Sequence, residues 1–237
     1  MRSVSGSLLI LVLLVPSRAF TSEGQETPSG EEATPRPTLE APRGWAGLFG
    51  GALAAGADGL ESGGLFGGGG AFHFSNRLGV EVGLERRRQD AVGTSSNALS
   101  GGSLTSTIIT GGPVVRFPLS PRLTPYFVAG VARFSTRFEV DPAVSGALAA
   151  LNFRLTEEVR SAVGLSVGGG VEVLVAKRFA AFGELRYLAA SADTRAELAD
   201  TVSGIASEVG GSQDLNGLEI RAGIRFVFQR APRKVSE

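Results

Sequence analysis

Hydrophobic and polar residues alternate along most of the chain, and the clearest case is residues 161–187. One parity holds valine, leucine and aromatic residues, and the other holds glycine, serine and charged residues such as Glu172, Glu184 and Arg186. Successive side chains of a β-strand point to opposite faces, so this pattern predicts a β-hairpin around a turn at 176–178. Its charged face fits either a soluble sandwich, with that face in water, or a transmembrane barrel, with that face in the lumen.

The same period of two recurs and predicts six further strands, at 45–53, 64–74, 78–88, 104–117, 126–140 and 217–228. The strand at 78–88 alternates valine and leucine with acids and arginines, and the strand at 217–228 does the same with isoleucine and phenylalanine. On the strand at 126–140 we expect the large apolar residues to face outward and the arginines to face inward. The outward set is Tyr126, Val128, Phe134 and Phe138, and the inward arginines are Arg133 and Arg137.

Strand number and connection length together favour the membrane alternative. The eight strands are mostly about 9–15 residues long, and a tilted transmembrane strand needs about 9–11. Short connections alternate with long polar ones at 89–102, 141–160 and 191–216, the last with a helical turn expected at 195–209. Bacterial outer-membrane barrels have short periplasmic turns and longer extracellular loops. The prediction is an all-β protein, an eight-stranded antiparallel up-and-down transmembrane β-barrel of that orientation.

Charged residues on the polar parity form a candidate lumen network. Charges are costly in a lipid-embedded wall but can pair inside it. An ion or proton path and a salt-bridged plug are both open, and the plug is favoured because side chains fill a barrel of eight strands. The network comprises Glu81, Glu85, Arg87, Arg116, Arg133, Arg137, Glu172, Glu184, Arg186, Glu219, Arg221 and Arg225.

Aromatic residues near the predicted strand ends form a second candidate set. They suit the interfacial girdle of a membrane barrel better than a ligand platform. The set is Trp45, Phe66, Phe72, Phe74, Phe117, Tyr126, Phe179, Tyr187, Phe226 and Phe228.

The termini differ in composition from the strands. Residues 1–19 combine an early arginine, an apolar run of eight residues and a small-residue cleavage pattern, which predicts a cleaved signal peptide. Residues 20–43 are rich in proline and glutamate and predict a disordered periplasmic segment. The barrel is then expected at 44–228, followed by a polar tail at 229–237.

Composition excludes several kinds of function. Lys+Arg and Asp+Glu both total 23, which argues against a nucleic-acid partner. Cysteine is absent, so no disulfide or cysteine-ligated metal is expected, and no motif indicates a cofactor. The four glycines at 67–70 lack the lysine and the strand-to-helix context of a phosphate-binding loop.

Three stretches carry a resemblance to a known family. They are PRLTPYFVAGVARF at 121–134, GLSVGGGVEVLVAKRFAAFGELRYL at 164–188 and GLEIRAGIRFVF at 217–228. They resemble the small eight-stranded outer-membrane barrels, the OmpA/OmpX-like β-barrel domain family. The resemblance implies a place in the outer membrane, contact with its lipid and lipopolysaccharide, and insertion by the barrel-assembly machinery. Barrels of this family commonly end in phenylalanine, whereas here Phe228 is followed by nine residues.

The single histidine begins a second, shorter resemblance. His73, Ser75 and Asn76 are similar to the motif of outer-membrane lipid A deacylases of the PagL type. That resemblance implies His73 as base, Ser75 as nucleophile and Glu81 or Glu85 as the orienting acid. The predicted topology places these residues at the periplasmic end, away from lipid A in the outer leaflet.

The favoured function is therefore a non-enzymatic outer-membrane barrel with a structural role in the envelope. Its loops at 89–102, 141–160 and 191–216 would be available to bind a surface ligand. The alternatives are a lipid A-modifying hydrolase, a narrow pore, and a soluble lipocalin-like barrel with apolar residues inside and charges outside.

Overall fold

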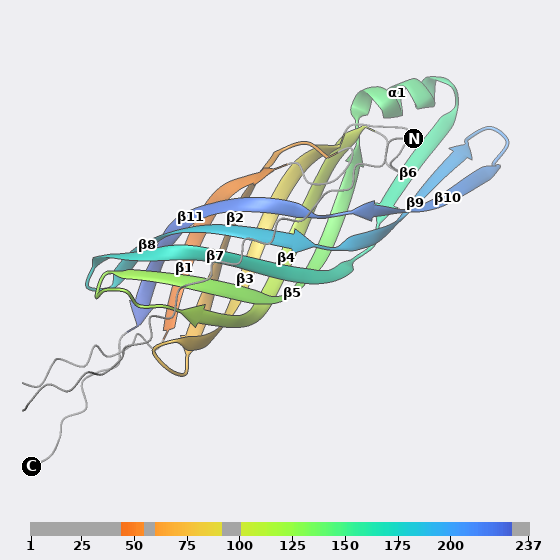
Figure 1. Ribbon diagram of the computed structural model, residues 1–237. Coiled ribbons are helices and arrows are strands. Elements are labelled where there is room, and N and C mark those ends of the chain that lie inside the picture. The colour runs from red at the N-terminus through yellow and green to blue at the C-terminus, as the bar shows by residue number, and fades with distance from the viewer. Residues whose placement is uncertain (1–43, 55–59, 92–100, 229–237) are drawn as a thin grey trace, which may run out of the picture. The chain divides into compact units, whose positions relative to one another are not determined.

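Eight antiparallel strands close into a barrel (Figure 1). The computed structural model describes residues 44–54, 60–91 and 101–228. The predicted signal peptide, the segment at 20–43, the tail at 229–237 and most of the loop at 89–102 lie outside these residues. The barrel strands are β1 (Gly44–Ala54), β2 (Gly63–His73), β3 (Leu78–Ala91), β4 (Gly102–Arg116), β5 (Leu123–Val140), β7 (Ala162–Ala176), β8 (Phe179–Ala189) and β11 (Gly217–Phe228). Around the barrel they follow the order β1-β11-β8-β7-β5-β4-β3-β2, which confirms the predicted fold class.

The period of two translates directly into two faces of the barrel wall. On β3 every second residue from Gly79 to Ala91 is buried, and the residues between them are exposed. Exposed positions carry large apolar side chains, such as Val82, Leu165 and Ile220, whose exposed fractions are 58%, 67% and 58%. Apolar outside and charged inside is the arrangement of a membrane barrel and the reverse of a lipocalin-like barrel, so the soluble alternative is wrong.

The two ends of the barrel differ as the connection lengths predicted. The connections at 74–77, 117–122 and 177–178 are short and lie at one end, the turn end. β1 begins and β11 ends there, because Gly44 pairs with Phe228. The longer connections lie at the other end, the loop end.

Two of the long connections are more regular than predicted. The segments at 141–160 and 191–216 contain β6 (Phe153–Val159), β9 (Ser191–Asp200) and β10 (Ala206–Asp214). These strands form a second sheet of order β10-β9-β6, which continues β11, β8 and β7 past the barrel in Figure 1. The helical turn expected at 195–209 is wrong, because the alternation of β8 persists through Ala192, Thr194 and Ala196.

The one helix among the described residues lies in the connection between β5 and β6. Helix α1 (Pro142–Ala150) starts after Asp141, whose carboxylate accepts a hydrogen bond from the Ala143 amide at 2.7 Å. Proline at the first turn and an acid at the N-cap are typical of helix starts. This helix is too short to cross a bilayer, and no other described segment is helical.

Strand β5 corrects the predicted orientation of its side chains. Tyr126, Val128, Phe134 and Phe138 are buried inside the barrel, and Arg133 and Arg137 are exposed on its outer wall. The expectation assumed that charge always faces the lumen. An outward arginine costs about 2–4 kcal/mol at the middle of a bilayer but only about 0–1 kcal/mol near its surface, so the rule fails toward the strand ends.

The aromatic residues divide in the same way. Phe66, Phe72, Phe74, Phe117, Phe179, Tyr187 and Phe228 are exposed on the outside, as a girdle requires. The girdle prediction is wrong for Trp45 and Tyr126, whose exposed fractions are 7% and 4%, because both side chains lie inside the barrel. Gly170 faces Tyr126 on the neighbouring strand, where a Cβ would approach the phenol oxygen to 2.7 Å. A glycine at this position therefore makes room for the tyrosine ring and for the backbone oxygen of Gly183, which a Cβ would approach even more closely.

Candidate functional site

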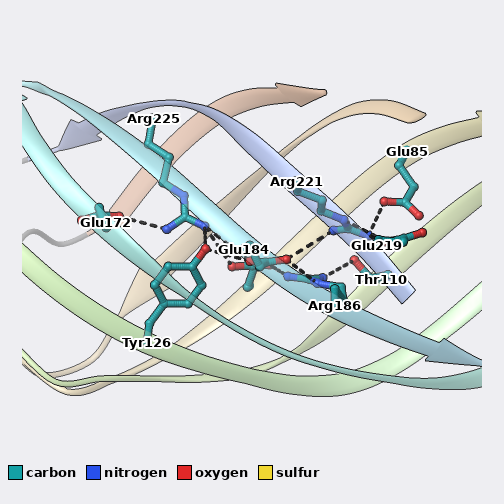
Figure 2. Close-up of polar contacts among 10 residues, drawn as sticks. Glu85, Thr110, Tyr126, Glu172, Glu184, Arg186, Glu219, Arg221 and Arg225 are labelled. Atoms are coloured by element: carbon teal, nitrogen blue, oxygen red, sulfur yellow. Dashed lines mark hydrogen bonds and ion pairs between the residues drawn. The ribbon is translucent and has the colours of Figure 1, made fainter. Parts of the chain in front are cut away.

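A network of buried charges fills the middle of the barrel (Figure 2). Ten of the twelve predicted lumen residues are buried there, and only Arg133 and Arg137 are not. The ten are Glu81, Glu85, Arg87, Arg116, Glu172, Glu184, Arg186, Glu219, Arg221 and Arg225. Five are glutamates and five are arginines, so their formal charges sum to zero.

Toward the turn end, Arg225 is held by both charge and aromatic rings. Its guanidinium lies 4.0 Å from the ring centres of Trp45 and Phe182. It donates hydrogen bonds of 3.0 Å to Glu172 and to the hydroxyl of Tyr126. Contacts between a cation and an aromatic ring strengthen when the cation is shielded from water. The buried Arg225 guanidinium is therefore stabilised by the two rings as well as by its hydrogen bonds.

Glu172 joins this group to the opposite wall. Its second carboxylate oxygen accepts a hydrogen bond of 2.7 Å from Arg116 on β4. One glutamate on β7 thus connects β4 to β11, two strands that are not neighbours in the barrel. Charge pairing across the lumen therefore supplements the backbone hydrogen bonds of the wall.

The centre of the network is Arg186 on β8. It donates hydrogen bonds of 2.6 Å to Glu184 on its own strand and to Glu81 on β3. A weaker bond of 3.4 Å reaches the hydroxyl of Thr110 on β4. Glu184 also accepts a bond of 2.8 Å from Tyr126. Sequence reasoning missed Tyr126 and Thr110 as members, although Thr110 shares the inward parity of Arg116.

Arg221 and Arg87 extend the network toward the loop end. Arg221 forms ion pairs with Glu85 and Glu219 and lies 3.6 Å from Glu184. Arg87 lies 3.9 Å from Glu219 and donates a hydrogen bond of 2.9 Å to the backbone oxygen of Leu215. Each buried charge therefore has at least one opposite charge beside it, which burial demands.

An apolar cluster fills the barrel between the charge network and the loop end. It consists of Leu60, Ala91, Leu104, Ile108, Ala132, Phe134, Phe138, Val159, Ala162, Leu188, Ala190, Ala192 and Leu215. Phe134 and Ile108 have no exposed surface, and the Arg87 guanidinium lies 5.1 Å from the Phe134 ring centre. A small cavity lined by residues of β3, β4, β5, β7 and β8 has a volume of about 10 Å³, roughly room for one water. The arrangement is a packed plug.

The residues of the deacylase hypothesis are not assembled. His73 is buried in the lumen beside Gly79, where a Cβ would lie 2.7 Å from the imidazole Cδ2. Ser75 is exposed in the turn after β2, and its hydroxyl accepts bonds from the Arg77 and Leu78 amides at 3.2 and 3.0 Å. Among the described residues no hydrogen bond joins His73 to Ser75. The candidate acids Glu81 and Glu85 are paired with arginines.

The outer wall carries charges that sequence reasoning did not single out. Arg86 and Arg88 occupy the outward parity of β3, near Arg133 and Arg137 on β5. The sequence contained the signal that places Arg86 and Arg88 outside. Both lie an even number of residues from the outward Val82, so their side chains point away from the lumen, where Arg87 lies. These four arginines lie close together on the outer wall at the loop end.

Comparisons agree with this architecture. Residues 7–228 match the family described as outer membrane protein beta-barrel domain. No curated protein sequence matches the chain.

Among solved structures, the chain resembles the outer membrane protein OprG from Pseudomonas aeruginosa, with a TM-score of 0.62 and 14% identity over 81% of this chain and 98% of that one. Neisserial surface protein A gives a TM-score of 0.49 and 14% identity over 78% and 96% of the two chains. Ail of Yersinia pestis gives 0.43 and 16% over 78% and 99%. At this identity the likeness to OprG shows a shared fold alone. Because the family match spans most of the chain, the protein belongs to the outer membrane protein beta-barrel domain family.

Proposed function

We propose that this outer-membrane barrel is a non-enzymatic envelope protein, closed to solutes, that presents a binding surface at its loop end. The observation that carries this proposal is the filled interior. Ten paired charges and an apolar cluster occupy the lumen, and a channel would need them to move aside. The proposed orientation places the turn end in the periplasm and the loop end outside the cell.

The loop end supports a binding role by its construction. The sheet of β6, β9 and β10 extends three barrel strands beyond the wall, and rigid scaffolds commonly position loops that bind partners. One face of this sheet carries charges, including the exposed ion pair of Arg195 and Glu208 at 2.9 Å. The other face carries apolar residues such as Leu198 and Val209. The segments proposed to bind a surface ligand are 89–102, 141–160 and 191–216.

The orientation is tested by epitope tags on intact cells. Single tags are inserted at Asn76, Ser120, Gly146 and Gly204, and each strain is labelled from outside and treated with protease. The expected result is that the tags at Gly146 and Gly204 are exposed and those at Asn76 and Ser120 are shielded. Exposure of the Asn76 tag alone would invert the orientation and bring the His73 and Ser75 hydrolase hypothesis back for assay on lipid A.

The closed lumen is tested by single-channel recording. The purified full chain in planar bilayers is expected to show no stepwise conductance, because the plug leaves no continuous aqueous path. Phe134→Ser serves as a comparison variant, since it removes the largest apolar side chain of the plug that has no exposed surface. Regular conductance steps from the unaltered protein would establish the narrow pore instead.

A further inference from the structure

Four arginines stand on the outer wall of the barrel at its loop end. Arg86 and Arg88 lie on β3, Arg133 and Arg137 lie on β5, and all four are exposed. Together they are named the arginine patch. Within the described ranges none of them forms an ion pair, and the polar contact found is a bond of 3.5 Å from Arg88 to the hydroxyl of Ser103. The four charges of the patch therefore have no ion-pair partner among the described residues.

The strand register places the four close together. Thr105 on β4 pairs with both Arg88 and Arg137, and Ile109 pairs with Arg133. Arg86 lies two residues from Arg88, beside Thr107. With strands about 4.8 Å apart and about 3.4 Å per residue, the Cα atoms of the patch span about 10 Å across the wall and about 14 Å along it. This area suits a sugar headgroup with phosphates at both ends better than a single phosphate.

The patch lies at a defined height on the barrel wall, at the edge of its apolar band. Below it the outward side of β5 is apolar from Leu123 to Val131. Ten residues separate Leu123 from Arg133, about 34 Å along the strand and about 26 Å along the barrel axis at a tilt of about 40°. The apolar band of outer-membrane barrels is about 25 Å tall. The arginines therefore begin where the hydrocarbon ends and the lipid headgroups start.

The patch occupies one sector of the wall. At the same end, the outward residues of the other barrel strands are uncharged, as with Val163 on β7, Leu218 on β11 and Ala52 on β1. Asp90 and Glu139 form the next outward row toward the loops, on either side of Ser103. These acids would repel a phosphate above the patch, so an anionic group is confined to the arginine rows.

We propose that the arginine patch binds the phosphorylated headgroup of a glycolipid in the outer leaflet. Guanidinium groups form paired hydrogen bonds with phosphate oxygens, and the hydroxyls of Thr105, Thr107 and Ser135 lie between the arginines to contact sugar oxygens. The site holds a lipid beside the wall and leaves the lumen plug untouched. It rests on the orientation proposed above, which the epitope tags test independently.

The test measures lipid retention by the full-length protein. The purified chain is incubated with bisphosphorylated lipid A, and bound lipid is counted by native mass spectrometry from detergent. The variant R86Q/R88Q/R133Q/R137Q is expected to bind at least tenfold more weakly, and R133K/R137K, which keeps the charges, is expected to keep more of the binding. The matched control is R77Q/R122Q, which removes two exposed arginines at the turn end and should retain lipid A.

Competing ligands identify the source of the phosphate. Dephosphorylated lipid A is expected to bind as weakly to the unaltered protein as lipid A binds to the fourfold variant. Equal retention of lipid A by that variant, or equal binding of phosphatidylglycerol, overturns the proposal. If an equal concentration of inorganic phosphate displaces lipid A, the patch binds free phosphate and not the lipid, and the proposal is overturned. If the tags at Gly146 and Gly204 are exposed and lipid retention is unchanged, the lipid site alone fails.

Discussion

The arginines inside the barrel and those on its outer wall have the same chemistry and opposite circumstances. Inside, Arg186 and Arg221 are nearly inaccessible and each contacts more than one glutamate. Outside, Arg133 and Arg137 are exposed and have no ion pair with a described residue. Burial makes a partner obligatory for the inner group, whereas the outer group has its charges free for a ligand. In this fold, therefore, the position of a charge along the strand matters as much as its parity.

The largest expected effect comes from removing an inner arginine. Arg186→Met leaves Glu81 buried without its closest partner and weakens the contacts of Glu184, so we expect a loss of about 3–5 kcal/mol in unfolding free energy. Urea unfolding in lipid vesicles measures it, with fluorescence of Trp45, the single tryptophan, as the probe.

The matched control is Arg133→Met, the same chemical change on the outer wall. It should leave the unfolding midpoint nearly unchanged, and equal losses for the two variants would break the comparison. Glu81→Gln combined with Arg186→Met should recover part of the loss, because the double variant removes one of the buried uncompensated charges.

An intermediate effect is expected from filling the space beside the network. Gly170→Ala places a methyl group against the backbone oxygen of Gly183 and the ring of Tyr126 and should cost about 1–3 kcal/mol through overpacking. The control is Gly183→Ala, where nothing lies within 4 Å of the added Cβ. The same urea titration compares them, and a Gly170 variant as stable as the Gly183 variant would show that the lumen is loosely packed.

A smaller effect on stability is expected from the outer arginines. R133Q/R137Q should change the unfolding free energy by no more than about 0.5 kcal/mol, as exposed substitutions without partners usually do. Chemical denaturation in vesicles free of lipid A isolates this contribution. A loss of several kcal/mol would place these two residues in the structural network after all.

The smallest expected effect concerns the turn between β9 and β10, outside the membrane-spanning strands. The Asp200 carboxylate accepts hydrogen bonds from the Ser203 hydroxyl and from the Val202 amide, and these hold its pKa below the ordinary value. A lowered pKa means that the stabilisation is present at neutral pH and is lost as the pH falls through the folded value. The protection factors of the Val202 and Ser203 amides, which correct the exchange rate for its intrinsic pH dependence, should hold at neutral pH and fall only in acid, and Asp200→Asn should remove that change.

The sequence predicted much of the candidate site because parity is a local property. On β11, and on β3 as far as Glu85, charge occupies a single parity, so Glu85, Glu219 and Arg221 could be assigned to the lumen without coordinates. The sequence alone did not predict that Tyr126 belongs to the lumen network, because an aromatic ring suits the membrane surface as well as the lumen. The pairing between strands was not accessible at all, since Glu81 and Arg186 are 105 residues apart in the chain.

By itself the sequence determined the eight strands, their alternation and the two unequal ends of the barrel. These follow from the fixed two-residue repeat of a strand and from the lengths of polar connections. The faces of β5, the strands within the connections at 141–160 and 191–216, and the clustering of the outward arginines of β3 with those of β5 became evident only from the tertiary structure. Those features depend on where a residue lies relative to the membrane edge and on which strands meet across the lumen, and neither is encoded in the local pattern.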